Sequence, residues 1–463
     1  MSFPKEFIWG AASAAYQIEG GAFEDGKGAS IWDQFSHQPG KVHGGHTGDI
    51  AADTYHRFEA DLDLMVGLGI RNYRFSISWP RVFPEGETGT LSEDGTPSGL
   101  NPKGIDYYDR LVDGCLSRGI VPWVTLYHWD LPLALFQKGG WLSRNTALCF
   151  GDYAAYIARH FKGRVRSYIT LNEPQCSIGL GHVTTVHAPG IQYSCSEQFT
   201  SWHNIMLAHG LAVRSIREND PDAAVGFAST GHLAYIHEHP EETPDDLVRT
   251  SFVTPPPEDN PEYFFNHHWF LDPVFKGHYP DDPDHPWTPF IKDAAAEDMA
   301  VISSPVDFAG LNIYNGIELV PGETGYVRAE KYPGYPRNSL KWPVTPEILY
   351  WGPRLIYERY GKEMYILENG VSCNDRIFLD GKVHDPDRID FLHRYIGELK
   401  ECCGDGVPVK GYFQWSLTDN FEWHSGYDDR FGLIYIDYRD QRRIPKDSAA
   451  WYAEVIKTNG SSL

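Results

Sequence analysis

The chain has 463 residues, a formal net charge of −23, and 41% apolar and 14% aromatic residues. The charge argues against nucleic acid and anionic membranes as partners, because both are polyanions that would repel the protein. The apolar content is enough for one large core, and a small neutral substrate would be indifferent to the charge.

No feature of the sequence divides the chain into parts. It has no Ser/Gly-rich tract and no charge block, and the Pro-rich patch at 255–257 is too short to separate domains. We therefore expect residues 1–463 to form a single domain, although length alone would suggest about three.

The cysteines and the N-terminal residues indicate the cellular compartment in which the protein is expected. Seven cysteines without a C-x-x-C pair are typical of reduced thiols rather than of a disulfide framework. The opening MSFPKEFIWG has no basic segment followed by a long apolar run, and no stretch reaches transmembrane length. We expect a soluble, cytoplasmic protein, and the sequence makes no prediction about its oligomeric state.

In chain order, the run at 7–12 predicts a first strand that continues to residue 20, with Gln17 near its carboxyl end. Apolar residues three and four apart then predict a helix over 50–69, closed by Gly69. Further strand patterns follow at 73–79, 121–130, 165–172, 225–228, 307–314, 364–369 and 409–417, with helical patterns between them at 101–119, 143–163, 199–216 and 389–399. Eight strands that alternate with helices predict an α/β fold, a (β/α)8 barrel with elaborated βα loops.

Two of these strands end in a glutamate. In YITLNEP, Pro174 cannot continue a strand, so Glu173 falls at the carboxyl end, where barrel enzymes carry their chemistry. MYILENG repeats the construction, with Glu368 before an Asn and a Gly that permits a tight turn. One such glutamate is more often solvated surface than functional. Two are what a retaining glycoside hydrolase requires, one as acid and one as nucleophile, with carboxyl groups about 5 Å apart.

The segments TLNEP, ILENG and WSLTDNFEW resemble family 1 glycoside hydrolases, the β-glucosidase and β-galactosidase group, and the resemblance runs from Phe7 to about Trp451. It implies that Glu173 is the acid/base, that Glu368 is the nucleophile and that Arg74 lies beside the nucleophile. The substrate-binding residues that it implies, with neighbours on the same strand ends, are Gln17, His128, Trp129, Asn172, Asn312, Tyr314, Trp342, Trp415, Glu422 and Trp423. Trp415 would form a platform under the sugar, and Trp342 an apolar wall for the leaving group. Asn312 would share a strand face with Tyr314.

Two residues depart from the family pattern. Leu367 stands where Thr often precedes the nucleophile, and Gln175 stands where Trp often follows Asn-Glu-Pro. Neither change removes a catalytic group. We expect Gln175 to lie toward the leaving group.

Three related functions are alternatives. A 6-phospho-β-glycosidase resembles others of its kind in a Ser-x-x-Lys-x-Tyr arrangement after strand eight, whereas residues 428–431 here read Asp-Asp-Arg-Phe and would repel a phosphate. A thioglucosidase of the myrosinase type lacks the acid/base carboxylate, which Glu173 supplies here. A sugar-binding barrel without catalysis would have no need for both glutamates.

Metal catalysis is the remaining class. His43, His46, His267 and His268 form no helical His-x-x-x-His pair and join no cysteine cluster. His209, at helical spacing among apolar residues, is interpreted as a satisfied buried histidine. We expect no metal and no cofactor.

The expected substrates are small β-glycosides or short oligosaccharides with a terminal glucosyl or galactosyl residue, since a carboxylate such as Glu422 accepts from either orientation of the 4-hydroxyl. We also expect a bell-shaped pH profile of kcat/KM. Repulsion from an ionised neighbour should place its alkaline limb at roughly 6 to 7.

Overall fold

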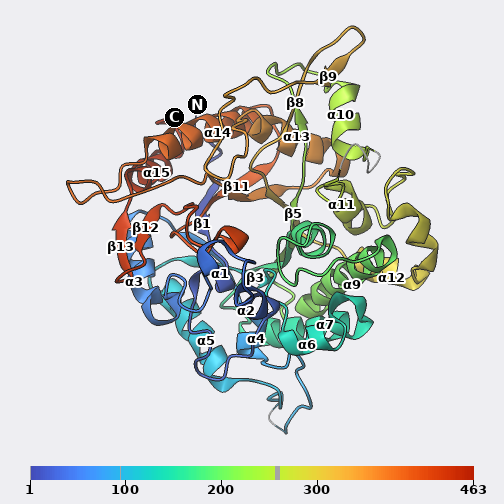
Figure 1. Ribbon diagram of the computed structural model, residues 1–463, viewed down its shortest axis with the longest axis vertical. Coiled ribbons are helices and arrows are strands. Elements are labelled where there is room, and N and C mark those ends of the chain that lie inside the picture. Colours follow the sequence, from blue (N-terminus) through green and yellow to red (C-terminus); the bar gives the residue numbers. More distant parts are fainter. Residues whose placement is uncertain (1, 94, 256–260) are drawn as a thin grey trace.

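The computed structural model describes residues 2–93, 95–255 and 261–463, so Pro256 and Pro257 of the Pro-rich patch lie outside the described residues. Eight parallel strands close into a barrel in the order β1-β11-β10-β7-β5-β4-β3-β2. In Figure 1 the strands lie around the centre of the view and the long helices surround them. The predicted (β/α)8 barrel is confirmed.

The barrel strands are β1 (Ile8–Ala12), β2 (Asn72–Ser76), β3 (Val121–Tyr127), β4 (Ser167–Asn172), β5 (Ala224–Thr230), β7 (Phe308–Asn312), β10 (Met364–Asn369) and β11 (Val409–Trp415). The longer helices are α3 (Thr54–Gly67), α5 (Pro102–Ser117), α7 (Arg144–His160), α9 (Cys195–Asn219), α13 (Ile348–Tyr360), α14 (Pro386–Gly404) and α15 (Asp447–Thr458). Gly69 has a φ of 73° just beyond α3, as a helix-closing glycine requires.

Several predicted strands end earlier than expected, among them those at 7–20, 73–79, 121–130, 307–314 and 409–417. The first ends at Ala12, and Gln17 lies in the short helix α1 (Ala15–Ile18), where the Ala15 N–H donates to Ser76 Oγ at 2.7 Å. The alanines that extend the apolar run are good helix formers, and β2 supplies the acceptor that turns the chain. Strand β7 ends at Asn312, so Tyr314 lies beyond it rather than on a shared strand face.

Additional elements occupy the connections between barrel strands and helices. They include the helices α2 (Ile31–Ser36), α4 (Trp79–Val82), α6 (Leu133–Gln137), α8 (Pro174–Ile178), α10 (Asp245–Phe252), α11 (His268–Phe275) and α12 (Ala296–Ile302). Strands β6 (Ala234–Tyr235), β8 (Ile317–Pro321) and β9 (Tyr326–Arg328) form a small sheet, and β12 (Ile434–Asp437) pairs with β13 (Arg442–Pro445). In the part of the chain that the structure describes, no helix has the length and apolarity that a membrane span requires. All seven cysteines are free thiols.

A buried network of ion pairs holds the segment that follows β11. Asp419 accepts from Arg430 at 2.5 Å and from Lys446 Nζ at 2.7 Å, and the same ammonium lies 2.5 Å from Asp375. The Lys446 side chain is fully buried. The network therefore ties residues 416–431, which contribute to the cavity described below, to the start of α15.

We predict that Lys446→Met destabilises the protein by about 2–3 kcal/mol, because it removes a buried charged donor that Asp419 and Asp375 share and leaves them with Arg430 and Arg388 alone. Urea unfolding followed by circular dichroism measures the change. The control is Lys457→Met, since Lys457 pairs with Glu454 on an exposed surface and should leave the free energy of unfolding nearly unchanged. Equal effects of the two substitutions would contradict the role of the network.

Candidate active site

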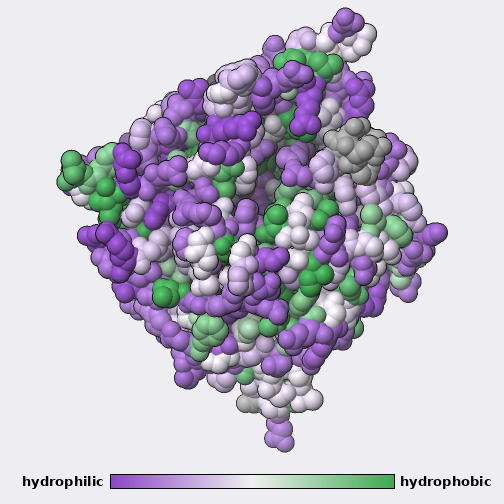
Figure 2. Space-filling view, in the orientation of Figure 1, coloured by the Kyte–Doolittle hydropathy of each residue, from purple (hydrophilic) through white to green (hydrophobic). Residues whose placement is uncertain are grey.

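A cavity of about 530 Å³ opens at the carboxyl ends of the barrel strands. Figure 2 shows the surface hollowed near the middle of this face. The predicted site residues that line it are His128, Trp129, Glu173, Tyr314, Trp342, Glu368, Trp415, Glu422 and Trp423. Gln17, Arg74, Asn172 and Asn312 are fully buried and bond to residues of this set or to one another.

Glu368 lies at the end of β10 and is held by a cation and a phenol. Arg74 Nη1 donates to its Oε1 at 2.5 Å, and Tyr314 Oη donates to its Oε2 at 2.8 Å. The next glycine, Gly370, has no left-handed backbone. A Cβ there would lie 1.8 Å from the Trp415 carbonyl oxygen, so close approach of β11, rather than the predicted tight turn, requires glycine.

Glu173 caps α8 with a left-handed backbone, φ 44°. Its Oε1 accepts from Asn312 Nδ2 at 2.7 Å, and its Oε2 faces the Cys176 thiol at 3.2 Å. Asn312 Nδ2 also donates to Asn172 Oδ1 at 3.0 Å, and Arg74 Nη2 donates to the same oxygen at 2.5 Å. A continuous set of bonds therefore connects the two glutamates across the barrel.

The two carboxylates differ in their neighbours. Burial, and next the charge of Glu368, raises the pKa of Glu173 to about 8. Burial also raises the pKa of Glu368, but the Arg74 cation and the Tyr314 hydrogen bond act in the opposite direction. Since a cation contacts only Glu368, we assign the proton of the pair to Glu173. The predicted alkaline limb at 6 to 7 considered repulsion alone, and burial acts on Glu173 in the same direction.

Several buried polar atoms at the cavity have no hydrogen-bond partner among the described residues, and they include Gln17 Oε1, His128 Nδ1, His187 Nδ1 and Asn312 Oδ1. His128 Nε2 lies 3.1 Å from Asn172 Nδ2, which can only donate, so the imidazole proton lies on Nδ1. Burial, and next the charge of Arg74, lowers the pKa of His128 well below its usual value, which keeps the ring neutral. The site thus retains unused hydrogen-bonding capacity for a polar ligand.

Aromatic rings form the walls. The rings of Trp129 and Trp423 are 4.5 Å apart, and the Trp415 ring lies 5.8 Å from that of His128. Like Glu173, Trp129 and Trp423 have left-handed backbone conformations, with φ of 77° and 51°. Strained backbone of this kind persists only where the surroundings enforce it, and it is typical of functional sites.

Glu422 is a third carboxylate of the cavity. Gln17 Nε2 donates to its Oε2 at 3.4 Å. Burial, followed by the charges of Asp429 and Glu368, raises the pKa of Glu422 well above its usual value. Arg74, the cation that contacts Glu368, donates its hydrogen bonds to other groups and not to this carboxylate.

The expectation for Gln175 is wrong. Its amide donates to Ser229 Oγ at 2.8 Å and to the Asn266 carbonyl, and Gln175 is not among the residues that line the cavity. Its polar end is therefore bound within the protein and does not face a leaving group.

Several lining residues escaped the sequence analysis. Leu180, Val186, His187, His232, Glu262 and Phe265 come from loops after β4 and β5, and no motif marked them. The contact of Cys176 with Glu173 could have been predicted from the sequence. Cys176 stands three residues after Glu173, a spacing that places two side chains on the same face of a helix.

The candidate metal ligands do not cluster. His268 Nε2 lies 2.8 Å from Asp282, and His267 Nδ1 lies 3.0 Å from Ser229 Oγ. Within the described ranges, no group of three or more His, Cys, Asp or Glu side chains is arranged to hold a metal ion. His209 is fully buried and its Nδ1 bonds Thr170 Oγ1 at 2.6 Å, which agrees with the predicted packing role.

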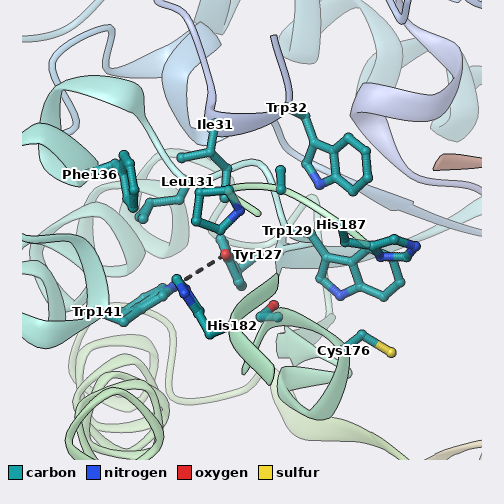
Figure 3. Close-up of a pocket in the computed structure, with 13 residues that line it drawn as sticks. Ile31, Trp32, Tyr127, Trp129, Leu131, Phe136, Trp141, Cys176, His182 and His187 are labelled. Carbon is teal, nitrogen blue, oxygen red and sulfur yellow. Dashed lines mark hydrogen bonds between the residues drawn. The ribbon is translucent and has the colours of Figure 1, made fainter. Parts of the chain in front are cut away.

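A second void of about 10 Å³ lies behind this site, with room for about one water molecule. Figure 3 shows its lining, including the hydrogen bond of 3.3 Å from Trp141 Nε1 to Tyr127 Oη. Trp129, Cys176 and His187 line both the void and the main cavity, and so form the wall between them.

Comparison with known proteins agrees with this geometry. The sequence profile of Glycosyl hydrolase family 1 matches residues 1–461. The chain is 41% identical to Beta-glucosidase A of Thermotoga maritima over 466 residues, covering 99% of this chain and 98% of that one. It is 37% identical to the aryl-phospho-beta-D-glucosidase BglC of Bacillus subtilis, covering 100% and 98%. A solved structure of the Thermotoga maritima β-glucosidase in complex with galacto-hydroximolactam superposes with a TM-score of 0.87 at 40% identity, with 99% of each chain covered.

We predict that Glu368→Gln lowers the pKa of Glu173. The substitution removes a like charge and leaves the Arg74 cation without its carboxylate, and both changes favour ionised Glu173. Because burial persists, the pKa should stay above the ordinary value of about 4.3. Carbon-13 NMR of labelled Glu measures it, with Glu398, whose pKa is raised to about 7 on α14, as the internal control. An unchanged pKa of Glu173 would show that the two carboxylates do not interact.

Proposed function

The chain belongs to glycosyl hydrolase family 1, and from this premise we propose that it removes terminal β-D-glucosyl and β-D-galactosyl residues with retention of configuration. It is a glycoside hydrolase of the β-glucosidase type. We further propose that residues 1–463 act as one catalytic domain and that the protein works in the cytoplasm on small β-glycosides or short oligosaccharides.

The observation that carries the mechanism is the unequal surroundings of the two glutamates. Glu368 contacts a cation and a phenol, which favour the ionised state that a nucleophile needs. Among the described residues no cation donates a hydrogen bond to Glu173, and burial with the charge of Glu368 raises its pKa to about 8, so we assign it the proton at neutral pH. This is the division of roles that double displacement requires.

In the first step, Glu173 donates its proton to the glycosidic oxygen while Glu368 attacks the anomeric carbon, and the leaving group departs as an alcohol. The covalent ester carries no charge, so the repulsion that raised the pKa of Glu173 falls. Glu173 then accepts a proton from water, which attacks the same carbon and releases Glu368. The sugar is freed with its original anomeric configuration.

The unpartnered atoms of Gln17, His128 and Asn312 support sugar recognition, because the hydroxyls of a pyranose are both donors and acceptors. The indoles of Trp415 and Trp423 supply apolar area for the faces of the ring. Glu422 accepts from either orientation of the 4-hydroxyl. The galacto-configured ligand in the Thermotoga maritima structure supports galactosides as second substrates.

A 6-phospho-β-glycosidase is the second candidate, favoured by the similarity to BglC. Against it stands the charge around Glu422. The charge of Asp429 already raises the pKa of that carboxyl, and Asp429 accepts from Ser339 at 2.5 Å. A phosphate placed there would meet carboxylates, so we propose that phosphorylated sugars are excluded.

Glu368→Ala should lower the rate of β-glucoside hydrolysis by several powers of ten, on the order of 10⁴-fold, because the nucleophile is lost. Added azide or formate should restore turnover, and azide should yield the glycosyl azide of inverted configuration. The control is Glu398→Ala, because Glu398 is a carboxylate with a raised pKa that lies outside the cavity. This variant should hydrolyse β-glucosides as fast as the parent enzyme, and azide should not change its rate. Turnover of Glu368→Ala near that of the parent would refute the assignment.

On a panel of nitrophenyl glycosides, we expect cleavage of the β-glucoside and the β-galactoside and not of the α-glucoside. The 6-phospho-β-glucoside should be cleaved far more slowly than the β-glucoside because of the carboxylates around Glu422. The ratios of kcat/KM decide the question. Preference for the phosphorylated sugar would replace our proposal with the second candidate.

A further inference from the structure

The two oxygens of Glu173 have different partners. Oε1 accepts a hydrogen bond from Asn312 Nδ2 at 2.7 Å. The NH₂ group of an amide donates and does not accept, so it could not accept a hydrogen bond from a proton on Oε1. The orientation of Asn312 is fixed by its second bond, from Nδ2 to Asn172 Oδ1 at 3.0 Å. When Glu173 is protonated, the proton therefore lies on Oε2.

The protein group that contacts Oε2 is the thiol of Cys176, with Sγ at 3.2 Å. A thiol is a weak donor and a weak acceptor. Toward the ionised carboxylate it donates weakly, and toward the protonated carboxyl it competes little for the proton. Burial raises the pKa of Cys176 well above its usual range, so the group stays a neutral thiol.

We propose that Cys176 is a positioning residue for the acid/base: it orients Oε2 of Glu173 and leaves the proton on that oxygen free for transfer to the substrate. This inference rests on the proposed role of Glu173. A hydroxyl in place of the thiol would bind the ionised carboxylate more strongly, and an apolar group would not bind it.

The surroundings of Cys176 agree with this role. In Figure 3 its sulfur points away from Tyr127 and Trp141, which lie on the far side of the void. The side chain belongs to the wall between the void and the main cavity.

Other groups also act on Glu173, and they remain unchanged in Cys176 variants. They are Glu368 on β10, Arg74 on β2, and Tyr314 and Glu422 from the loops after β7 and β11. A shift that differs in sign between two substitutions of Cys176 therefore cannot originate from these charges.

The test compares Cys176→Ser with Cys176→Val. Serine should stabilise ionised Glu173 and lower its pKa, moving the alkaline limb of kcat/KM down by about 0.5 to 1 pH unit. Valine removes the donor and should move the limb up by a similar amount. The substrate is phenyl β-D-glucoside, whose leaving group needs protonation, and carbon-13 NMR follows Glu173 directly. Cys402→Ser is the matched control, a buried cysteine on α14, and should leave the profile in place whatever its effect on stability.

The proposal is supported if Cys176→Ser and Cys176→Val shift the Glu173 pKa from NMR in opposite directions, and shift the alkaline limb of kcat/KM in the same two directions. If neither variant moves the Glu173 pKa, or both move it in one direction, the thiol has no such role, and the assignment of Glu173 itself is untouched. If the NMR pKa moves while the kinetic limb stays, Glu173 is not the acid/base, and both the proposed function and this inference fail.

Discussion

The site depends on the hydrogen bonds that the buried guanidinium group of Arg74 donates. It donates to Glu368 Oε1 and the Leu367 carbonyl on β10, to Asn172 Oδ1 on β4, and to Thr125 Oγ1 on β3. A cation inside a barrel is tolerated only when its donors are satisfied. One side chain therefore sets the relative positions of strand ends that are far apart in the sequence, and through Asn172 and Asn312 it also orients Glu173.

This arrangement separates the charge of the cavity into two regions. Arg74 and Tyr314 favour the ionised form of Glu368 against the effect of burial, whereas burial and like charges act together to raise the pKa values of Glu173 and Glu422. In the mechanism that we propose, these contrasting neighbours let one residue type serve as both acid and nucleophile.

The barrel and the two glutamates were predictable because they depend on local patterns. Apolar runs, helical spacing and a proline after Glu173 are visible in a single sequence. The position of Gln17 on α1 depends on an acceptor from β2, and the binding of Gln175 by Ser229 depends on β5. These contacts join segments separated by more than fifty residues, so no local pattern predicts them. Burial of Glu173 likewise results from the assembled fold, so the sequence indicated only the repulsion between the two carboxylates.

In the mechanism that we propose, the left-handed backbone of Glu173 places the demands of folding and of activity in conflict. A glycine would adopt φ 44° without the penalty, on the order of 1 kcal/mol, that other residues incur there, and it would bury no carboxyl group. The most stabilising choices at residue 173 are thus residues that cannot transfer a proton. Selection for thermal stability alone would favour replacement of Glu173. Engineering for stability should therefore keep residue 173 unchanged and introduce stabilising substitutions at other positions.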